Sequence, residues 1–168
     1  MKGVDNFENI GEFTSSAPNF LVDIYGVLLI PKREVADTAE IFQNPLEINH
    51  HLLEFLKQKR HNGSKIAIIS NVAQYQFEKE FWSRLTDLEQ GIFDQIILSG
   101  NEGVSKPNPK IFQIALERLS EIPENCVLVD DSPTNVEVAR RLGMGGIIYQ
   151  NFNQFEQEME ELCQNCQR

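Results

Sequence analysis

The sequence has little positive charge, few cysteines and no long apolar run, and each shortage argues against a class of protein. Lys and Arg number 15 against 25 Asp and Glu, which gives a net charge of −10 and a pI of about 4.8. Nucleic acids and anionic membranes attract basic patches, so we expect neither as a partner. No stretch reaches membrane-spanning length and the N-terminus has no apolar signal region, which predicts a cytoplasmic protein.

The three cysteines are an odd number, so the sequence does not suggest a disulfide framework. Cys163 and Cys166 form a C-x-x-C pair near the C-terminus. Two ligands do not complete a zinc site. The pair also lacks the strand-to-helix turn of a thioredoxin-like redox site. We interpret it as an incidental feature of a helix end.

The sequence does contain short apolar runs typical of strands, which alternate with segments whose apolar residues have helical spacing. Short apolar, β-branched runs occupy residues 19–24, 65–70, 93–98, 126–129 and 146–149. Such continuous runs are typical of parallel strands that are covered on both faces. Helical spacing follows each strand, as in Ile48, Leu52, Phe55 and Leu56, with a stop at residues 62–63.

This alternation predicts an α/β fold of three layers, in which a central parallel sheet of about five strands has helices on both faces. At 168 residues the chain is long enough for one domain with a substantial core. We predict an N-terminal extension at residues 1–18 and the domain at residues 19–168. Residues 30–46 form one long connection without a clear assignment.

Further helical patterns contain Phe77, Phe81 and Leu85, and then Ile111, Ile114, Ala115 and Leu119. In the next one, Ser132 has the character of an N-cap, Pro133 suits the first turn and Gly143 ends the helix. The last helix contains Phe152, Phe155, Met159 and Leu162.

Polar residues stand where three of the predicted strands end. The first strand ends on Asp23, the second on Ser70 and Asn71, and the fourth on Asp130 and Asp131. In an open parallel sheet, ligands bind outside the carboxyl ends of the strands. One such aspartate, Asp131 for example, could instead cap a helix. Three polar strand ends, together with a lysine before a predicted helix in SKPNPKIF, favour a shared site.

With these residues in this order, the chain resembles the haloacid dehalogenase superfamily over about residues 18–150. The four motifs of that superfamily stand in order: DIYGV at 23–27, IISN at 68–71, Lys106 in SKPNPKIF, and VDDSPTNVEVARRLGM at 129–144. Each motif alone is a weak indication of this superfamily, but the four motifs in this order are a specific one. The resemblance implies a Rossmann-like hydrolase domain without a large cap domain, because residues 30–46 leave no room for one.

The resemblance also implies roles for individual residues. Asp23 would be the nucleophile that forms a covalent aspartyl intermediate. Ser70, Asn71 and Lys106 would bind the transferring group, and Lys106 would offset negative charge.

Phosphatases of the superfamily use Mg²⁺. By position, its ligands would be the Asp23 carboxylate, the backbone carbonyl of Tyr25 and the Asp131 carboxylate, an oxygen set that suits Mg²⁺. Asp130 and Asn135 would support the site from behind. Gly26 would give the backbone freedom for the turn after the nucleophile.

The sequence departs from the phosphatase pattern at Tyr25, where most members carry a second aspartate that serves as general acid and base. The dehalogenase branch has D-x-Y-G there, but it works without metal, lacks an acidic pair like Asp130 and Asp131, and carries a cap. Three functions therefore stay open. They are a Mg²⁺-dependent phosphate-ester hydrolase with altered proton handling, a weak or inactive binding module, and a 2-haloacid dehalogenase-like hydrolase.

Substrate identity is not encoded in these motifs, because caps carry much of the specificity in this superfamily. We expect a phosphorylated small molecule or macromolecule. A site without a cap also predicts closure by a partner, by a second copy in a homo-oligomer that covers the strand ends, or by a large substrate, since exclusion of water strengthens electrostatic interactions.

Overall fold

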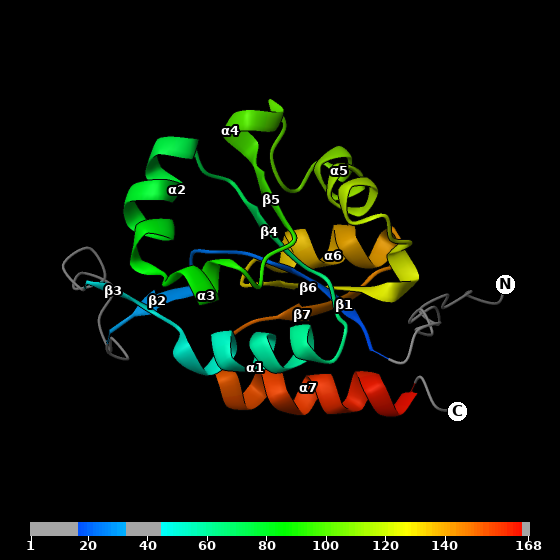
Figure 1. Ribbon diagram of the computed structural model, residues 1–168. Helices are drawn as coiled ribbons and strands as arrows, with labels where there is room; N and C mark the ends of the chain where they lie inside the picture. The colour runs from blue at the N-terminus through cyan, green and yellow to red at the C-terminus, as the bar shows by residue number, and fades with distance from the viewer. Residues whose placement is uncertain (1–16, 33–44, 166–168) are drawn as a thin grey trace, which may run out of the picture.

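The structure is a computed structural model that describes residues 17–32 and 45–165 (Figure 1). Nearly all of the predicted N-terminal extension, most of the connection at residues 30–46, and Cys166 of the C-x-x-C pair lie outside the described residues.

A five-stranded parallel sheet forms the centre of the molecule, as the sequence predicts. In spatial order it consists of β5 (Gln95–Leu98), β4 (Ile66–Ser70), β1 (Asn19–Val22), β6 (Cys126–Asp130) and β7 (Gly145–Ile148). The chain moves from β1 outward to one side and later returns to the other side of β1. This reversal places the carboxyl ends of β4, β1 and β6 next to one another, where α/β sheets bind ligands.

Helices cover both faces of the sheet (Figure 1). On one face lie α1 (His50–His61) and α7 (Phe152–Asn165), and on the other lie α5 (Pro109–Leu119) and α6 (Pro133–Arg141). Successive residues of a strand point to opposite faces. Phe20 and Val22 accordingly belong to the core under α1 and α7, whereas Leu21 belongs to the core under α5 and α6. Burial on both faces explains why the strand sequences are continuously apolar.

The connection after β1 forms a small antiparallel pair of strands, β2 (Leu29–Pro31) and β3 (Leu46–Ile48). Ile48, predicted to lie on the first helix, therefore belongs to β3. Helix α1 begins at His50, because the side chain of Asn49 caps it by accepting a hydrogen bond from the backbone N–H of Leu52 at 3.3 Å. The predicted stop at Asn62 and Gly63 is confirmed, with Gly63 at φ +96°.

The segment between β4 and β5 is not one helix, although Phe77, Phe81 and Leu85 have helical spacing. It divides into α2 (Gln74–Glu80), the 3₁₀ turn η2 (Trp82–Arg84) and α3 (Asp87–Gln90). The side chain of Thr86 forms a capping box with Glu89 that starts α3, so Leu85 before it is extended. The capping box therefore starts a new helix here, although the spacing of the apolar residues predicts a single continuous one.

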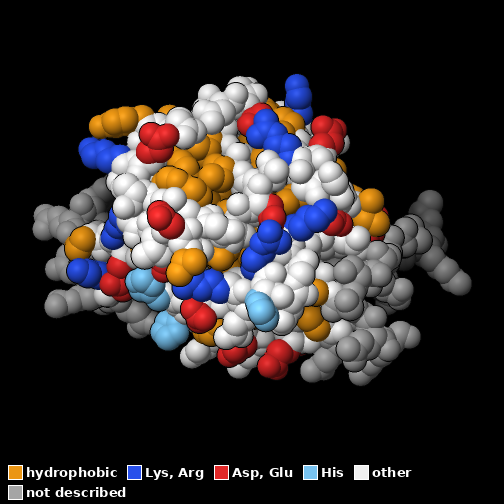
Figure 2. Space-filling view, in the orientation of Figure 1, with side chains coloured by type: hydrophobic (Ala, Val, Ile, Leu, Met, Phe, Trp, Pro, Cys, Tyr) orange, Lys and Arg blue, Asp and Glu red, His pale blue; other side chains and the backbone are white. Residues whose placement is uncertain are grey.

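Short elements complete the chain, namely α4 (Ser99–Glu102) and η3 (Pro123–Asn125). On the face seen in Figure 2, Lys and Arg side chains are interspersed with Asp and Glu and form no single basic patch. None of the helices in the described part of the chain is long and apolar enough to cross a membrane.

Candidate active site

The polar strand ends meet at the carboxyl edge of the sheet. Asp23 follows β1 directly, Ser70 is the last residue of β4, and Asp130 is the last residue of β6. Oxygen atoms of Asp23, Asp130 and Asp131 lie within 4.8 Å of one another. The convergence expected from the sequence therefore brings three carboxylates into one small space.

Lys106 joins two of these carboxylates. Its Nζ lies 3.0 Å from Oδ1 of Asp23 and 2.6 Å from Oδ2 of Asp130. The lysine side chain is only 1% exposed. Buried charges need partners, and Lys106 has one on each side. It therefore offsets charge at the predicted nucleophile.

Asn71 holds the loop that carries this lysine. The Asn71 side chain donates a hydrogen bond to the backbone carbonyl of Lys106 at 2.9 Å and accepts one from its backbone N–H at 2.8 Å. The sequence predicted Asn71 as a ligand of the substrate. In the structure its amide group is engaged by the lysine backbone, so its role in this state is to position Lys106.

Asp130 is fully buried and surrounded by donors. Besides Lys106, its carboxylate accepts hydrogen bonds from Nδ2 of Asn135 at 3.0 and 3.1 Å and from the backbone N–H of Ser132 at 2.9 Å. A buried carboxylate with several donors is firmly oriented. Asp130 thus links Asn135 to Lys106 behind Asp23.

Asp131 is exposed and faces the loop after Asp23. Gly26 has φ +79°, and a Cβ atom there would lie 2.3 Å from Oδ2 of Asp131. Only glycine permits both the backbone conformation and the close approach. The N-cap of α6 is Ser132, whose side chain makes no capping bond. The structure therefore does not support the alternative in which Asp131 is a helix cap.

The acidic groups repel one another. Burial raises the pKa of Asp23 above its ordinary value; the nearby Lys106 lowers it and Asp130 raises it further. Burial also raises the pKa of Asp131, with added repulsion from Asp23 and Asp130. One lysine does not compensate three carboxylates. Carboxylate oxygens at this spacing fit a hard divalent cation such as Mg²⁺.

The side chain of Tyr25 turns toward α2. Its hydroxyl donates a hydrogen bond to Oε2 of Glu80 at 2.5 Å, and Nε2 of Gln76 lies 3.4 Å from the same oxygen. Burial, followed by the bond to Glu80, raises the pKa of Tyr25 above its ordinary value. Sequence reasoning missed Glu80 and Gln76, because no motif marks a residue that meets Tyr25 from 55 positions away.

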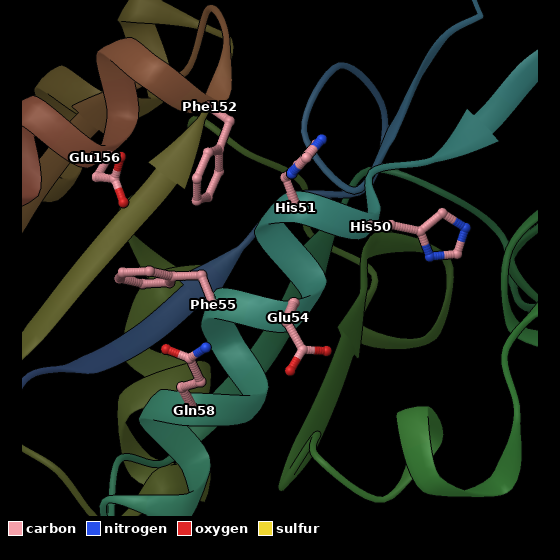
Figure 3. A pocket seen from close by; sticks show the side chains of 7 residues that line it. All are labelled: His50, His51, Glu54, Phe55, Gln58, Phe152 and Glu156. Carbon is pink, nitrogen blue, oxygen red and sulfur yellow. The ribbon is translucent and has the colours of Figure 1, made fainter.

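A second hollow, of about 480 Å³, lies between α1 and α7 and is separate from this site (Figure 3). Phe55 and Phe152 face it, and His50 and His51 at the start of α1 also line it. His50 and His51 are both exposed. None of the site residues described above lines this hollow.

The sheet and the residues at its carboxyl edge define a Rossmann-like α/β protein with a candidate hydrolytic site. A family model described as haloacid dehalogenase-like hydrolase matches residues 35–143, more than half of the chain. The chain belongs to this family, and the resemblance seen in its motifs is confirmed.

Individual relatives agree with the family. A phosphorylated carbohydrates phosphatase from Thermotoga maritima is 32% identical over 116 residues, which are 67% of this chain and 51% of that protein. A phosphoglycolate phosphatase from Aquifex aeolicus is 28% identical over 67% of this chain and 50% of its own length. The chain thus spans about half the length of these two curated relatives.

Solved structures share the fold. An uncharacterized protein from Corynebacterium glutamicum superposes with a TM-score of 0.64 at 28% identity, over 88% of this chain and 95% of that one. A HAD family enzyme from Bacteroides thetaiotaomicron, solved with magnesium and inorganic phosphate, has a TM-score of 0.63 at 18% identity. That match covers 80% of this chain and 94% of the other.

Proposed function

We propose that this protein is a Mg²⁺-dependent phosphate-ester hydrolase that works through an aspartyl-phosphate on Asp23. The observation that carries the proposal is the buried Lys106 between Asp23 and Asp130, at 3.0 and 2.6 Å, with Asp131 close by. This arrangement presents a carboxylate and a cation together at the open end of the sheet. Relatives named as phosphatases support the same chemistry.

In the first step an Oδ atom of Asp23 bonds to phosphorus and the ester P–O bond breaks, so the leaving oxygen takes the electron pair. Lys106 and the Ser70 hydroxyl hold the phosphoryl oxygens. In the second step water attacks phosphorus and the bond to Asp23 breaks, which yields inorganic phosphate and restores the carboxylate.

Mg²⁺ would be held by the carboxylates of Asp23 and Asp131 and the backbone carbonyl of Tyr25. When bound, it would neutralise charge between the nucleophile and the phosphate dianion. Asp130 would not need to bind it directly, since Lys106, Asn135 and the Ser132 N–H already engage its oxygens.

The need for a proton on the leaving group should decide which phosphate esters the protein hydrolyses. A general acid contributes roughly 10²–10⁴-fold, and the hydroxyl of Tyr25 already donates to Glu80. Leaving groups that are stable anions, such as aryl or acyl oxygens, need less help. We therefore expect activity on aryl and acyl phosphates and little on sugar or alkyl phosphates.

The direct test is turnover of an aryl phosphate such as p-nitrophenyl phosphate with millimolar Mg²⁺ and with EDTA. Release of phosphate only in the presence of Mg²⁺ supports the proposal. No turnover by a folded protein that binds Mg²⁺ overturns it.

A second candidate is a domain that binds Mg²⁺ and phosphate without turnover. The observation that favours it is again the bond between Tyr25 and Glu80, which leaves no acid at the position where most phosphatases carry one. Calorimetry with inorganic phosphate and Mg²⁺, on protein that fails the turnover test, distinguishes the two candidates.

The partner that closes the site is also part of the proposal. The described residues include no large cap over the strand ends, and water weakens the electrostatic interactions there. A second copy of the chain or a macromolecular phosphate would exclude it. Light scattering after size-exclusion chromatography tests the first; efficient turnover of small metabolites by a monomer would contradict both.

A further inference from the structure

The segment from Asn71 to Glu80 is hydrogen-bonded at each of its ends to a residue of the candidate site. At its start, Asn71 makes two hydrogen bonds to the backbone of Lys106, at 2.8 and 2.9 Å. At its end, Glu80 accepts the hydrogen bond of the Tyr25 hydroxyl at 2.5 Å. Lys106 contacts Asp23 directly, and Tyr25 follows Asp23 by two residues.

Helix α2 forms the last seven residues of this segment, Gln74–Glu80. Seven residues at 1.5 Å each give about 10 Å. In Figure 1, α2 stands beside the carboxyl edge of the sheet rather than over either face. Its buried residue is Phe77, which packs in the core together with Tyr25.

The polar face of α2 is built around the hydroxyl of Tyr25. Gln76 and Glu80 are four residues apart and therefore neighbours on one side of the helix. Nε2 of Gln76 lies 3.4 Å from Oε2 of Glu80, the oxygen that accepts the hydrogen bond of the Tyr25 hydroxyl. The neighbouring pair, Gln74 and Glu78, bond each other at 2.7 Å and are exposed.

We propose that α2 forms the wall of the site on the leaving-group side and that Glu80 is the positioning residue that holds this wall against Tyr25. This inference rests on the proposed function, because it assigns the part of a phosphate ester that α2 would contact. Tyr25 then serves as an anchor for α2, while Lys106 and Ser70 on the other side hold the phosphoryl group.

The two sides of a substrate are thus held by different parts of the protein. Inorganic phosphate needs only Asp23, Lys106, Ser70 and the metal. An aryl ester also needs the wall. Release of α2 should therefore raise KM for the ester and leave inhibition by inorganic phosphate unchanged.

The first experiment is hydrogen exchange on the complete protein, which needs no substrate. A hydrogen bond to a charged group contributes about 1.5–3 kcal/mol, so Glu80→Ala and Tyr25→Phe should each speed exchange of the α2 amides at least about tenfold. Glu78→Ala is the matched control on the same helix and should not. Glu80→Gln keeps an acceptor oxygen and should restore protection. If the α2 amides exchange at the wild-type rate in both Glu80→Ala and Tyr25→Phe, the proposal is overturned.

The second experiment is kinetic. In Glu80→Ala we expect KM for p-nitrophenyl phosphate to rise at least about fivefold, kcat to change less than threefold, and inhibition by phosphate to stay constant. The double variant Tyr25→Phe/Glu80→Ala should be no worse than either single one, because both remove the same bond. Equal loss of phosphate and ester binding would overturn the assignment of α2 to the leaving-group side.

The outcomes also separate this inference from the proposed function. If the wild-type protein has no phosphatase activity, the proposed function fails and the assignment of the wall falls with it. Hydrogen exchange then still decides whether Glu80 holds α2. If wild-type activity is present and Glu80→Ala behaves as wild type in both experiments, only this inference fails.

Discussion

The Lys106 side and the Tyr25 side of the site flank the same aspartate and are built on different principles. On the Lys106 side, a buried cation and the amide of Asn135 satisfy two carboxylates. On the Tyr25 side, a hydroxyl that could face the reaction instead meets a helix through Glu80. In the functions proposed above, one side manages charge at Asp23, and the other positions α2.

The two sides differ in how well they suit the two requirements of the proposed chemistry, which are stabilisation of charge and proton transfer. Stabilisation of charge needs fixed donors and cations, and these are buried and multiply bonded. Proton transfer needs a group whose pKa lies near the working pH, and burial moves the pKa of Tyr25 away from it. Four substitutions would break or sharpen this contrast.

The largest effect is expected at the residue that both sides share. Asp23→Asn removes the nucleophile, so we expect aryl-phosphate turnover to fall at least about 10³-fold. The measurement is phosphate release under saturating substrate and Mg²⁺, with circular dichroism to confirm folding. Activity of the folded variant within tenfold of wild type would exclude an aspartyl-phosphate on Asp23.

Asp131→Asn removes the negative charge of the exposed aspartate at the proposed Mg²⁺ site. It removes one of the proposed Mg²⁺ ligands, so we expect calorimetry to show Mg²⁺ affinity at least about tenfold lower. In wild-type protein, Mg²⁺ at a hundred times its Kd should stabilise the fold by about 2.7 kcal/mol, seen as a higher Tm. Glu137→Gln, an exposed change on α6, the helix that follows Asp131, is the control. Mg²⁺ that leaves wild-type melting unchanged and gives no heat would rule out the metal site.

Tyr25→Asp converts the Tyr25 side into the form that most phosphatases carry. It supplies a general acid, and we expect alkyl-phosphate hydrolysis to rise at least about tenfold. Tyr25→Phe is the control, because it loses the bond to Glu80 without gaining an acid. Asp23→Asn should abolish the gain. If Tyr25→Asp is folded, binds Mg²⁺ and gains nothing over Tyr25→Phe, the binding-module candidate is the better one.

Asn135→Ala has the smallest expected effect. It tests the hydrogen bonds that Asn135 donates to Asp130, the carboxylate that pairs with Lys106. The variant leaves the buried Asp130 carboxylate without its Asn135 donor, so we expect a loss of about 1–3 kcal/mol in the free energy of unfolding. Urea denaturation measures it. Thr134→Ala, exposed on the same turn of α6, should change stability much less. Equal effects of the two would mean that Asn135 does not support Asp130.

Much of the architecture could be predicted from the sequence. The five strands were recognised because burial on both faces of a parallel sheet demands continuous apolar runs. The ordered motifs predicted a site at Asp23, Lys106 and the acidic pair, and these residues lie close together in the structure. The errors were local: Ile48 lies in β3 and Leu85 outside any helix, since the side chains of Asn49 and Thr86 cap helices that begin just after them.

The sequence by itself determined the sheet, the order of its polar strand ends and the residues that manage charge, because these depend on periodicity and on neighbours along the chain. Only the tertiary structure decided which residue the Tyr25 hydroxyl bonds. Its partner Glu80 stands 55 residues away, on a helix whose local pattern indicates only that Phe77 is buried. A single hydrogen bond between distant residues has no periodicity, so it is visible only once the sheet has brought its two partners together.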